Sequence, residues 1–226
     1  IDFLKKIYMK IGVFTEFFES EKNSAGKVMS ELADELGNHA VLVDVYTLYK
    51  KPHNSSLKKE NINVYTLNYD FRKENISFLN RFIFELLISF RIFFLIFKVK
   101  KLKQYDVLIW YSPTIFWGPL IFTLGFFRKS YKYLILRDIF PQWSIDLNII
   151  KKGSFSNKIL NLFENLQYRV ADKIGVSSEG NISYFQKKTN YLKKIEVLET
   201  WYKTDINEKS LPKNIFTFSL FNSLPA

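Results

Sequence analysis

The sequence predicts an α/β fold, a Rossmann-like doubly wound parallel sheet with helices on both faces. The first observation is that six to seven short segments are apolar throughout, as in strands that are buried on both faces. The second is that stretches with helical spacing of apolar residues separate these segments. This alternation occupies residues 9–200 of the 226-residue chain. We therefore expect one large domain.

Each element follows from its own pattern. Strands are expected, in chain order, within 10–18 and at 40–46, 63–67, 105–113, 132–138, 172–178 and 194–199. Helices are expected between them at 23–37, 75–103, 114–127, 156–171 and 179–188. The first helix has the plainest signal, because Val28, Leu32 and Leu36 recur every four residues and Gly37 follows them. Parallel sheets bind ligands outside the carboxyl ends of their strands, so we expect the site in the loops there.

Composition excludes several kinds of site. The chain has no cysteine, which rules out disulfides, cysteine-based zinc sites and a thiol nucleophile. Its two histidines, His39 and His53, lie in no ligand-spaced cluster, and neither dinucleotide nor P-loop fingerprints are present, so we expect no metal and no cofactor. A formal net charge of +11 indicates a polyanionic partner, the alternative being the lysine-rich amino-acid usage of an AT-rich genome. Without a helix-turn-helix, zinc finger or RNP-like motif, we expect no nucleic acid among the partners.

Chemistry-bearing residues stand where predicted strands end. Arg137 and Asp138 close one strand, and the Asp138 carboxylate is a candidate base or positioning group for a hydroxyl. The alternative is a salt bridge between the two, or an N-cap. Ser178 and Glu179 open a helix, either as simple caps or as a way to present N–H groups to an anion. Gly26 either lets a phosphate approach the first helix or merely eases a turn.

The stretch 81–104 combines an apolar helix with cations. Its unbroken apolar run, 92–97, is far shorter than a membrane span. An apolar helix with cationic flanks can lie in the headgroup region of an anionic bilayer. The alternative is a crossover helix packed on the sheet with its lysines in water. The residues expected to contact the membrane are Arg91, Phe94, Lys98, Lys100 and Lys101.

Several stretches together resemble a known family. The most specific is E-x-x-x-Y-x-x-A-D-x-I-x-V-S-S at 164–178, followed by the RD-x-x-P turn at 137–141. With MKIGVF at 9–14 and VLETWYKTD at 197–205, they resemble the N-terminal, acceptor-binding half of family 4 glycosyltransferases of the GT-B fold. The resemblance is nearest to bacterial enzymes of O-antigen or capsular polysaccharide synthesis, including N-acetylfucosamine transferase-like ones. It spans residues 9–214.

The resemblance implies transfer of a sugar from a nucleotide-sugar to a polyprenyl-diphosphate-linked saccharide, at the cytoplasmic face of the inner membrane. Asp138 would then lie near the acceptor hydroxyl as the catalytic residue. The expected substrate-binding residues are Gly26, Lys27, Ser112, Arg137, Ser178 and Glu179. An alternative from another class is a non-catalytic membrane-docking remnant module.

The expected organisation follows from the same resemblance. Residues 1–8 are expected to be an upstream extension, and 9–200 the Rossmann-like acceptor-binding domain. Residues 201–214 would be the inter-domain crossover, and 215–226 a truncated or frame-shifted start of a donor domain. A chain lacking that domain is expected to be inactive alone, because little would hold the nucleotide-sugar.

Overall fold

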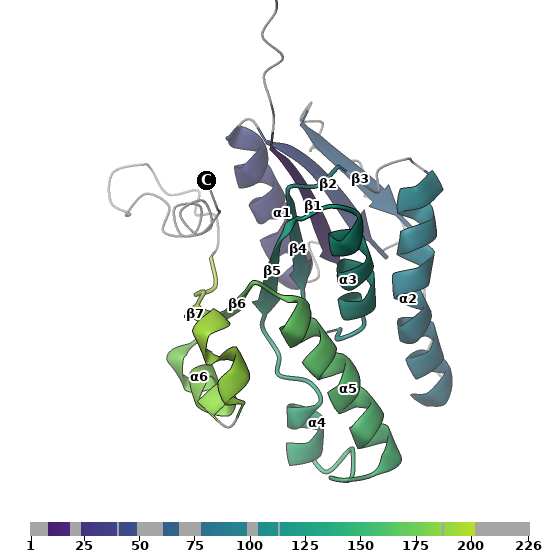
Figure 1. Cartoon of the computed structure of the whole chain (residues 1–226), viewed down its shortest axis with the longest axis vertical. Coiled ribbons are helices and arrows are strands. Elements are labelled where there is room, and N and C mark those ends of the chain that lie inside the picture. Colours follow the sequence, from purple (N-terminus) through teal and green to yellow (C-terminus); the bar gives the residue numbers. More distant parts are fainter. Residues whose placement is uncertain are drawn as a thin grey trace, which may run out of the picture.

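The computed structural model describes residues 9–18, 24–39, 41–48, 61–67, 78–98, 104–112, 114–186 and 188–201. They form a seven-stranded, fully parallel sheet in the order β3-β2-β1-β4-β5-β6-β7 (Figure 1). The strands are β1 Lys10–Thr15, β2 Leu42–Thr47, β3 Ile62–Thr66, β4 Val107–Tyr111, β5 Tyr131–Leu136, β6 Lys173–Val176 and β7 Ile195–Val197. This confirms the predicted fold class. The order reverses between β1 and β4, where doubly wound folds open a crevice.

Helices cover the sheet on both faces. They are α1 Ser24–Asn38, α2 Phe78–Lys98, α3 Trp117–Phe127, α4 Gln142–Asp146, α5 Phe155–Val170, α6 Glu179–Gln186 and the short 3₁₀ helix η1 Thr189–Lys194. α1 packs its apolar stripe on one face, in a cluster with Ile11, Val43 and Ile109. α2, α3, α5 and α6 contribute to the cluster on the other face. Because both faces are covered, the strands are apolar at most positions, although β2 carries the buried Asp44.

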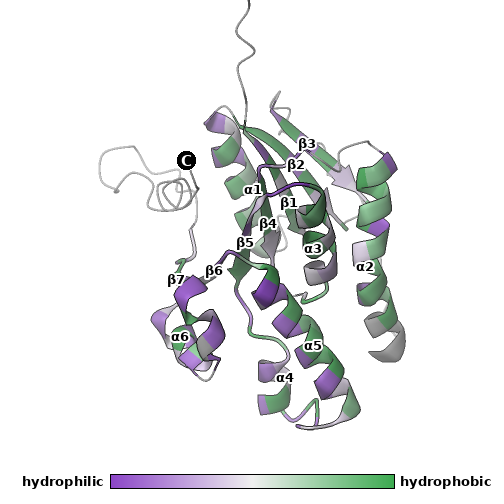
Figure 2. Ribbon diagram, in the orientation of Figure 1, coloured by the Kyte–Doolittle hydropathy of each residue, from purple (hydrophilic) through white to green (hydrophobic). Residues whose placement is uncertain are grey.

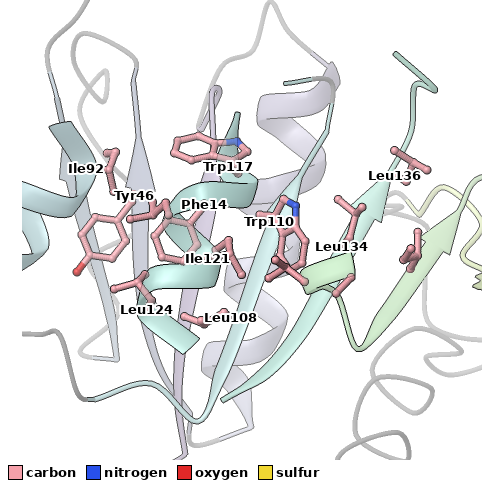
Figure 3. Close-up of a cluster of buried hydrophobic side chains, with 14 of the residues drawn as sticks. Phe14, Tyr46, Ile92, Leu108, Trp110, Trp117, Ile121, Leu124, Leu134 and Leu136 are labelled. Carbon is pink, nitrogen blue, oxygen red and sulfur yellow. The ribbon is translucent and has the colours of Figure 1, made fainter. Parts of the chain in front are cut away.

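The larger core cluster is rich in aromatic rings. Trp110 of β4 and Trp117 of α3 are both fully buried; Trp117 lies beside Phe14, and Trp110 lies beside Leu134 of β5 (Figure 3). The Phe14 ring stacks on Tyr46 with ring centroids 5.2 Å apart. Offset aromatic pairs of this kind add to the free energy gained by burying the rings. This cluster fixes α2 and α3 against the strands whose carboxyl ends form the site.

The most specific motif of the sequence connects α5 to α6. Glu164 is fully buried, and its carboxylate accepts hydrogen bonds from Tyr168 at 3.1 Å and Tyr184 at 2.5 Å. Lys188 donates to the same carboxylate at 2.7 Å, with its Nζ 4.9 Å from the Tyr184 ring centroid. A buried charge requires such pairing and hydrogen bonding. The Glu164–Tyr184 bond therefore joins α5 to α6.

α2 turns apolar side chains toward solvent. Its exposed residues between 83 and 98 are Ile83, Leu87, Phe90, Phe94, Phe97 and Lys98, so only the last is polar. Ser89 points inward instead and donates a hydrogen bond to the Phe116 carbonyl oxygen. Figure 2 shows α2 as apolar over most of its length. None of the described helices is long and apolar enough to cross a membrane.

Candidate functional site at the carboxyl edge of the sheet

Ser112 and Asp138 meet where β4 and β5 end. The buried Ser112 hydroxyl donates a hydrogen bond to the Asp138 carbonyl oxygen at 3.2 Å. The Phe140 backbone N–H donates to the same oxygen at 3.1 Å. These two bonds fix the turn, while Asp138 itself is exposed. An exposed carboxylate on a fixed backbone can accept a hydrogen bond from a substrate hydroxyl.

Arg137 anchors the chain that follows β7. Its guanidinium donates to the Leu198 carbonyl oxygen at 3.1 Å and to the Thr200 hydroxyl at 2.9 Å. Its central carbon lies 5.1 Å from the Trp201 ring centroid, within cation–π range. The Trp201 indole N–H donates in turn to the Val28 carbonyl oxygen of α1 at 3.2 Å. We call these contacts the Arg137 clamp; they fix segment 198–201 between β5 and α1.

The Arg137 clamp and the neighbouring Tyr111 are partly removed from water. Burial lowers the pKa of Arg137, although a guanidinium remains charged at any physiological pH. Burial raises the pKa of the neighbouring Tyr111, and the Arg137 charge opposes that rise. The Tyr111 hydroxyl is thus a neutral hydrogen-bonding group at neutral pH. Positive charge, a neutral hydroxyl and the Asp138 carboxylate therefore stand together at the rim.

The first turn of α1 carries the residues predicted to face donor phosphates. Gly26 is buried in that turn, whereas Lys27 is exposed, with its Nζ 3.9 Å from Glu31. The Trp201–Val28 bond brings this turn next to the Arg137 clamp. The structure thus connects Gly26 and Lys27, through the clamp, to Asp138 at the same edge of the sheet. Their roles toward a ligand stay predictions.

Ser178 and Glu179 stand at the end of the next strand. β5 pairs with β6 so that Leu136 lies opposite Val176, which places the loops after both strands side by side. Both residues are exposed, and the Asn181 N–H donates to the Ser178 carbonyl oxygen at 3.1 Å. They therefore face solvent in the loop next to Asp138. Their binding role stays a prediction.

Of the predicted membrane residues, Phe94 and Lys98 are exposed and Arg91 is half-buried. Lys100 and Lys101 lie outside the described residues. Within the described part of the chain, no three His, Asp or Glu side chains are grouped as metal ligands.

Sequence reasoning did not single out Tyr111 or Glu16 for the site. Glu16 follows β1 directly and is buried, and its carbonyl oxygen accepts a hydrogen bond from Thr47 at 3.1 Å. Their position in the chain could have indicated them. Glu16 stands at the carboxyl end of β1 and Tyr111 at that of β4, the two strands between which the strand order reverses. Trp201 was placed only at a chain crossover, and its contact with α1 had no local signal.

No protein-family model and no curated protein matches this sequence. Solved structures match it in fold. UGT2 of Phytolacca americana, complexed with UDP-2-fluoro-glucose and pterostilbene, superposes with a TM-score of 0.52 and 11% identity, over 87% of this chain and 55% of that one. A UGT transferase from Siraitia grosvenorii in complex with UDP gives a TM-score of 0.50 and 12% identity, over 88% and 52%. The chain thus has the fold of one half of a GT-B glycosyltransferase and spans about half the length of these structures.

The clamp gives a first prediction. Arg137→Met leaves the Leu198 carbonyl without its charged donor, and we expect the free energy of unfolding to fall by about 1.5–3 kcal/mol. Trp201 fluorescence should shift to the red as the indole gains water. Chemical denaturation followed by fluorescence measures both. Arg128→Met is the matched control, because Arg128 pairs with Asp106 at the surface and should change stability by about 0–1 kcal/mol. Equal effects of the two variants would contradict a fixed clamp.

Proposed function

We propose that this chain is the acceptor-binding half of a glycosyltransferase of bacterial surface polysaccharide synthesis. The complete enzyme would move a sugar from a nucleotide-sugar to a lipid-linked saccharide. The observation that supports this most is the exposed Asp138 on a fixed turn at the carboxyl edge of a GT-B-like half. The similar structures solved in complex with UDP or UDP-2-fluoro-glucose support a nucleotide-sugar as the donor.

Each residue of the candidate site has its own proposed role in sugar transfer. Asp138 accepts a hydrogen bond from the acceptor hydroxyl and orients its oxygen for attack. Ser112 holds Asp138 in place through its backbone. Ser178 and Glu179 supply further polar contacts to the acceptor from the adjacent loop. Gly26 allows close approach of the donor phosphates to the first turn of α1. Arg137, by anchoring segment 198–201, fixes where the chain leaves this domain.

A lipid-linked acceptor calls for contact with the membrane, and the outer face of α2 supports it. Phe94 and Phe97 are 65% and 62% exposed, and Lys98 ends the helix. Apolar side chains beside cations favour an anionic bilayer surface. The same face also supports the alternative of a docking module without catalysis. Phe94→Glu should weaken sedimentation with phosphatidylglycerol vesicles, and unchanged sedimentation would remove α2 from the membrane contact.

Chemical-shift mapping separates the two candidates. The isotope-labelled chain is titrated with a short-chain prenyl-diphosphate-linked N-acetylhexosamine, and UDP-N-acetylglucosamine is added in a separate titration. A sugar acceptor site predicts shifts at Ser112, Asp138, Ser178 and Glu179, and a donor contribution predicts shifts near Gly26. Shifts confined to α2 would support the docking module and contradict the acceptor site.

A further inference from the structure

A second apolar surface lies on the segment that follows Asp138 in the chain. Four large apolar side chains are exposed there: Trp143 at 43%, Leu147 at 66%, Ile149 at 61% and Phe155 at 78%. We call them the apolar tip. They belong to α4, the turn after it and the first residue of α5, which lie together at one end of the molecule (Figure 1). Clustered exposed apolar side chains mark an interaction surface.

Core packing and backbone hydrogen bonds hold the segment that carries the tip in one conformation. Ile150 is buried with Leu160 in a cluster that also includes Ile145 at its edge. The backbone N–H groups of Ile149 and Ile150 both donate to the Ser144 carbonyl oxygen, at 2.9 and 3.1 Å. Ile150 therefore anchors the segment to the core, while Leu147 and Ile149 before it point outward. The outward side chains are held in position before any partner arrives.

The anchor extends to the start of α5. The Ser154 hydroxyl caps the helix by accepting from the Asn157 N–H at 3.2 Å, and the Asn157 side chain accepts from the Gly153 N–H at 3.0 Å. Gly153 adopts a positive φ of 78°, which glycine tolerates without strain. This turn sets Phe155 on the outer side of the first helical turn. The tip thus has a defined shape on both α4 and α5.

Charge around the tip favours an anionic bilayer. Residues 139–158 contain three lysines, Lys151, Lys152 and Lys158, all exposed, and one acid, Asp146. Each lysine near an anionic lipid surface strengthens attachment, and tryptophan favours the boundary between headgroups and acyl chains. A two-fold dimer through the tip would instead place these lysines against their own copies, at a cost in repulsion.

We propose that the apolar tip inserts into an anionic lipid bilayer and holds Asp138 close to the membrane surface. Asp138 stands four residues before α4, and the turn between them is fixed by backbone hydrogen bonds. Because Asp138 is so close to the tip in the chain, insertion of the tip keeps the candidate acceptor site near the lipid headgroups. A lipid-linked saccharide presents its sugar there. The inference deepens the proposed function and rests on it for the identity of that acceptor. Insertion itself does not depend on sugar transfer.

Tryptophan fluorescence tests insertion directly, because two of the four tryptophans, Trp110 and Trp117, are fully buried. The full chain is mixed with phosphatidylcholine vesicles, with and without phosphatidylglycerol, some carrying brominated acyl chains. We expect a blue shift and quenching by the brominated chains only with the anionic lipid. Trp143→Phe should abolish both signals while vesicle binding persists.

Two variants probe the driving forces. Ile149→Glu should weaken binding about 10-fold or more, because a side chain that inserts is replaced by a charge. Lys151→Glu combined with Lys152→Glu should remove the preference for anionic lipid, and these exposed positions leave the fold intact. Leu162→Glu on α5 is the control, because Leu162 is 67% exposed but belongs neither to the tip nor to α2. Circular dichroism checks that each variant is folded.

The outcomes separate this inference from the proposed function. Vesicle binding without quenching of Trp143, or no binding at all, would overturn insertion of the tip. A change in molar mass by light scattering in Ile149→Glu, measured without lipid, would assign the tip to self-association instead. If the tip inserts but the acceptor causes no chemical-shift change at Asp138, the proposed acceptor site is contradicted and the membrane-docking surface is supported.

Discussion

Raising the pH above about 10 is expected to unfold the protein cooperatively. Tyr46, Tyr105, Tyr133 and Tyr168 are at most 2% exposed, and burial raises the pKa of each above the ordinary value of 10.0. Their surroundings are already acidic: Tyr105 donates to Asp44 at 2.9 Å and Tyr133 to Glu196 at 2.6 Å. A phenolate in either place would stand beside a carboxylate.

The direction follows from proton counting. Above pH 10 the unfolded chain has released these protons and the folded chain has kept them, so stability falls as pH rises. Below pH 10 both states are protonated and the contribution is complete. Above pH 10, each of these tyrosines lowers the free energy of unfolding by about 1.4 kcal/mol per pH unit. The four together lower it by about 5–6 kcal/mol per pH unit. That approaches the whole stability of a typical domain, about 5–15 kcal/mol.

Phenolate absorbance and far-UV circular dichroism, followed together, measure this loss. Both should change in one step, and the two curves should coincide. Tyr133→Phe removes one proton from the count and should reduce the slope of stability against pH by about 1.4 kcal/mol per pH unit. Complete tyrosine ionisation at a pKa of about 10 with an unchanged dichroism spectrum would contradict burial of these four side chains.

Lys188→Met is expected to lower the free energy of unfolding by about 3–5 kcal/mol, because it leaves the Glu164 carboxylate buried without its cation. Glu164 is fully buried, and Lys188 lies 2.7 Å from it. Urea denaturation measures the change. Lys27→Met is the matched control: the Lys27–Glu31 pair is 3.9 Å long with an exposed lysine, and its loss should cost about 0–1 kcal/mol.

A double variant separates charge from packing. If the penalty arises from an unpaired buried charge, then Glu164→Gln added to Lys188→Met should recover part of the lost stability. A Lys188→Met protein as stable as its Lys27→Met counterpart would show that the contact between α5 and α6 does not depend on this ion pair.

The order of strands and helices was predictable because each element carries its own period. Mostly apolar runs gave all seven strands, and the four-residue spacing of Val28, Leu32 and Leu36 gave α1 almost to its ends. α4 was missed, because a five-residue helix is too short to show a period. Its hydrogen bond from the Ile145 N–H to the Pro141 carbonyl oxygen is visible only in the folded chain.

Sidedness and long-range contacts were harder to predict. α2 is apolar on both its inner side, with Ile88 and Ile92, and its outer side, so its period alone could not say which side meets the sheet. The Arg137 clamp joins residues more than 60 positions apart, and no local pattern encodes such a contact. The sequence did place Arg137 and Asp138 at a strand end, and in the structure they directly follow β5.

Calorimetric titration of the chain with a short-chain prenyl-diphosphate-linked N-acetylhexosamine measures whether a lipid-linked saccharide binds at Asp138, as we propose. Asp138→Asn should weaken binding about 10-fold to 100-fold, the loss expected for one hydrogen bond to a charged group. Asp146→Asn, a neighbouring exposed acid that accepts a hydrogen bond from Gln142, should leave the affinity unchanged. No binding by the unaltered chain, or equal affinities of the two variants, would contradict an acceptor site at Asp138.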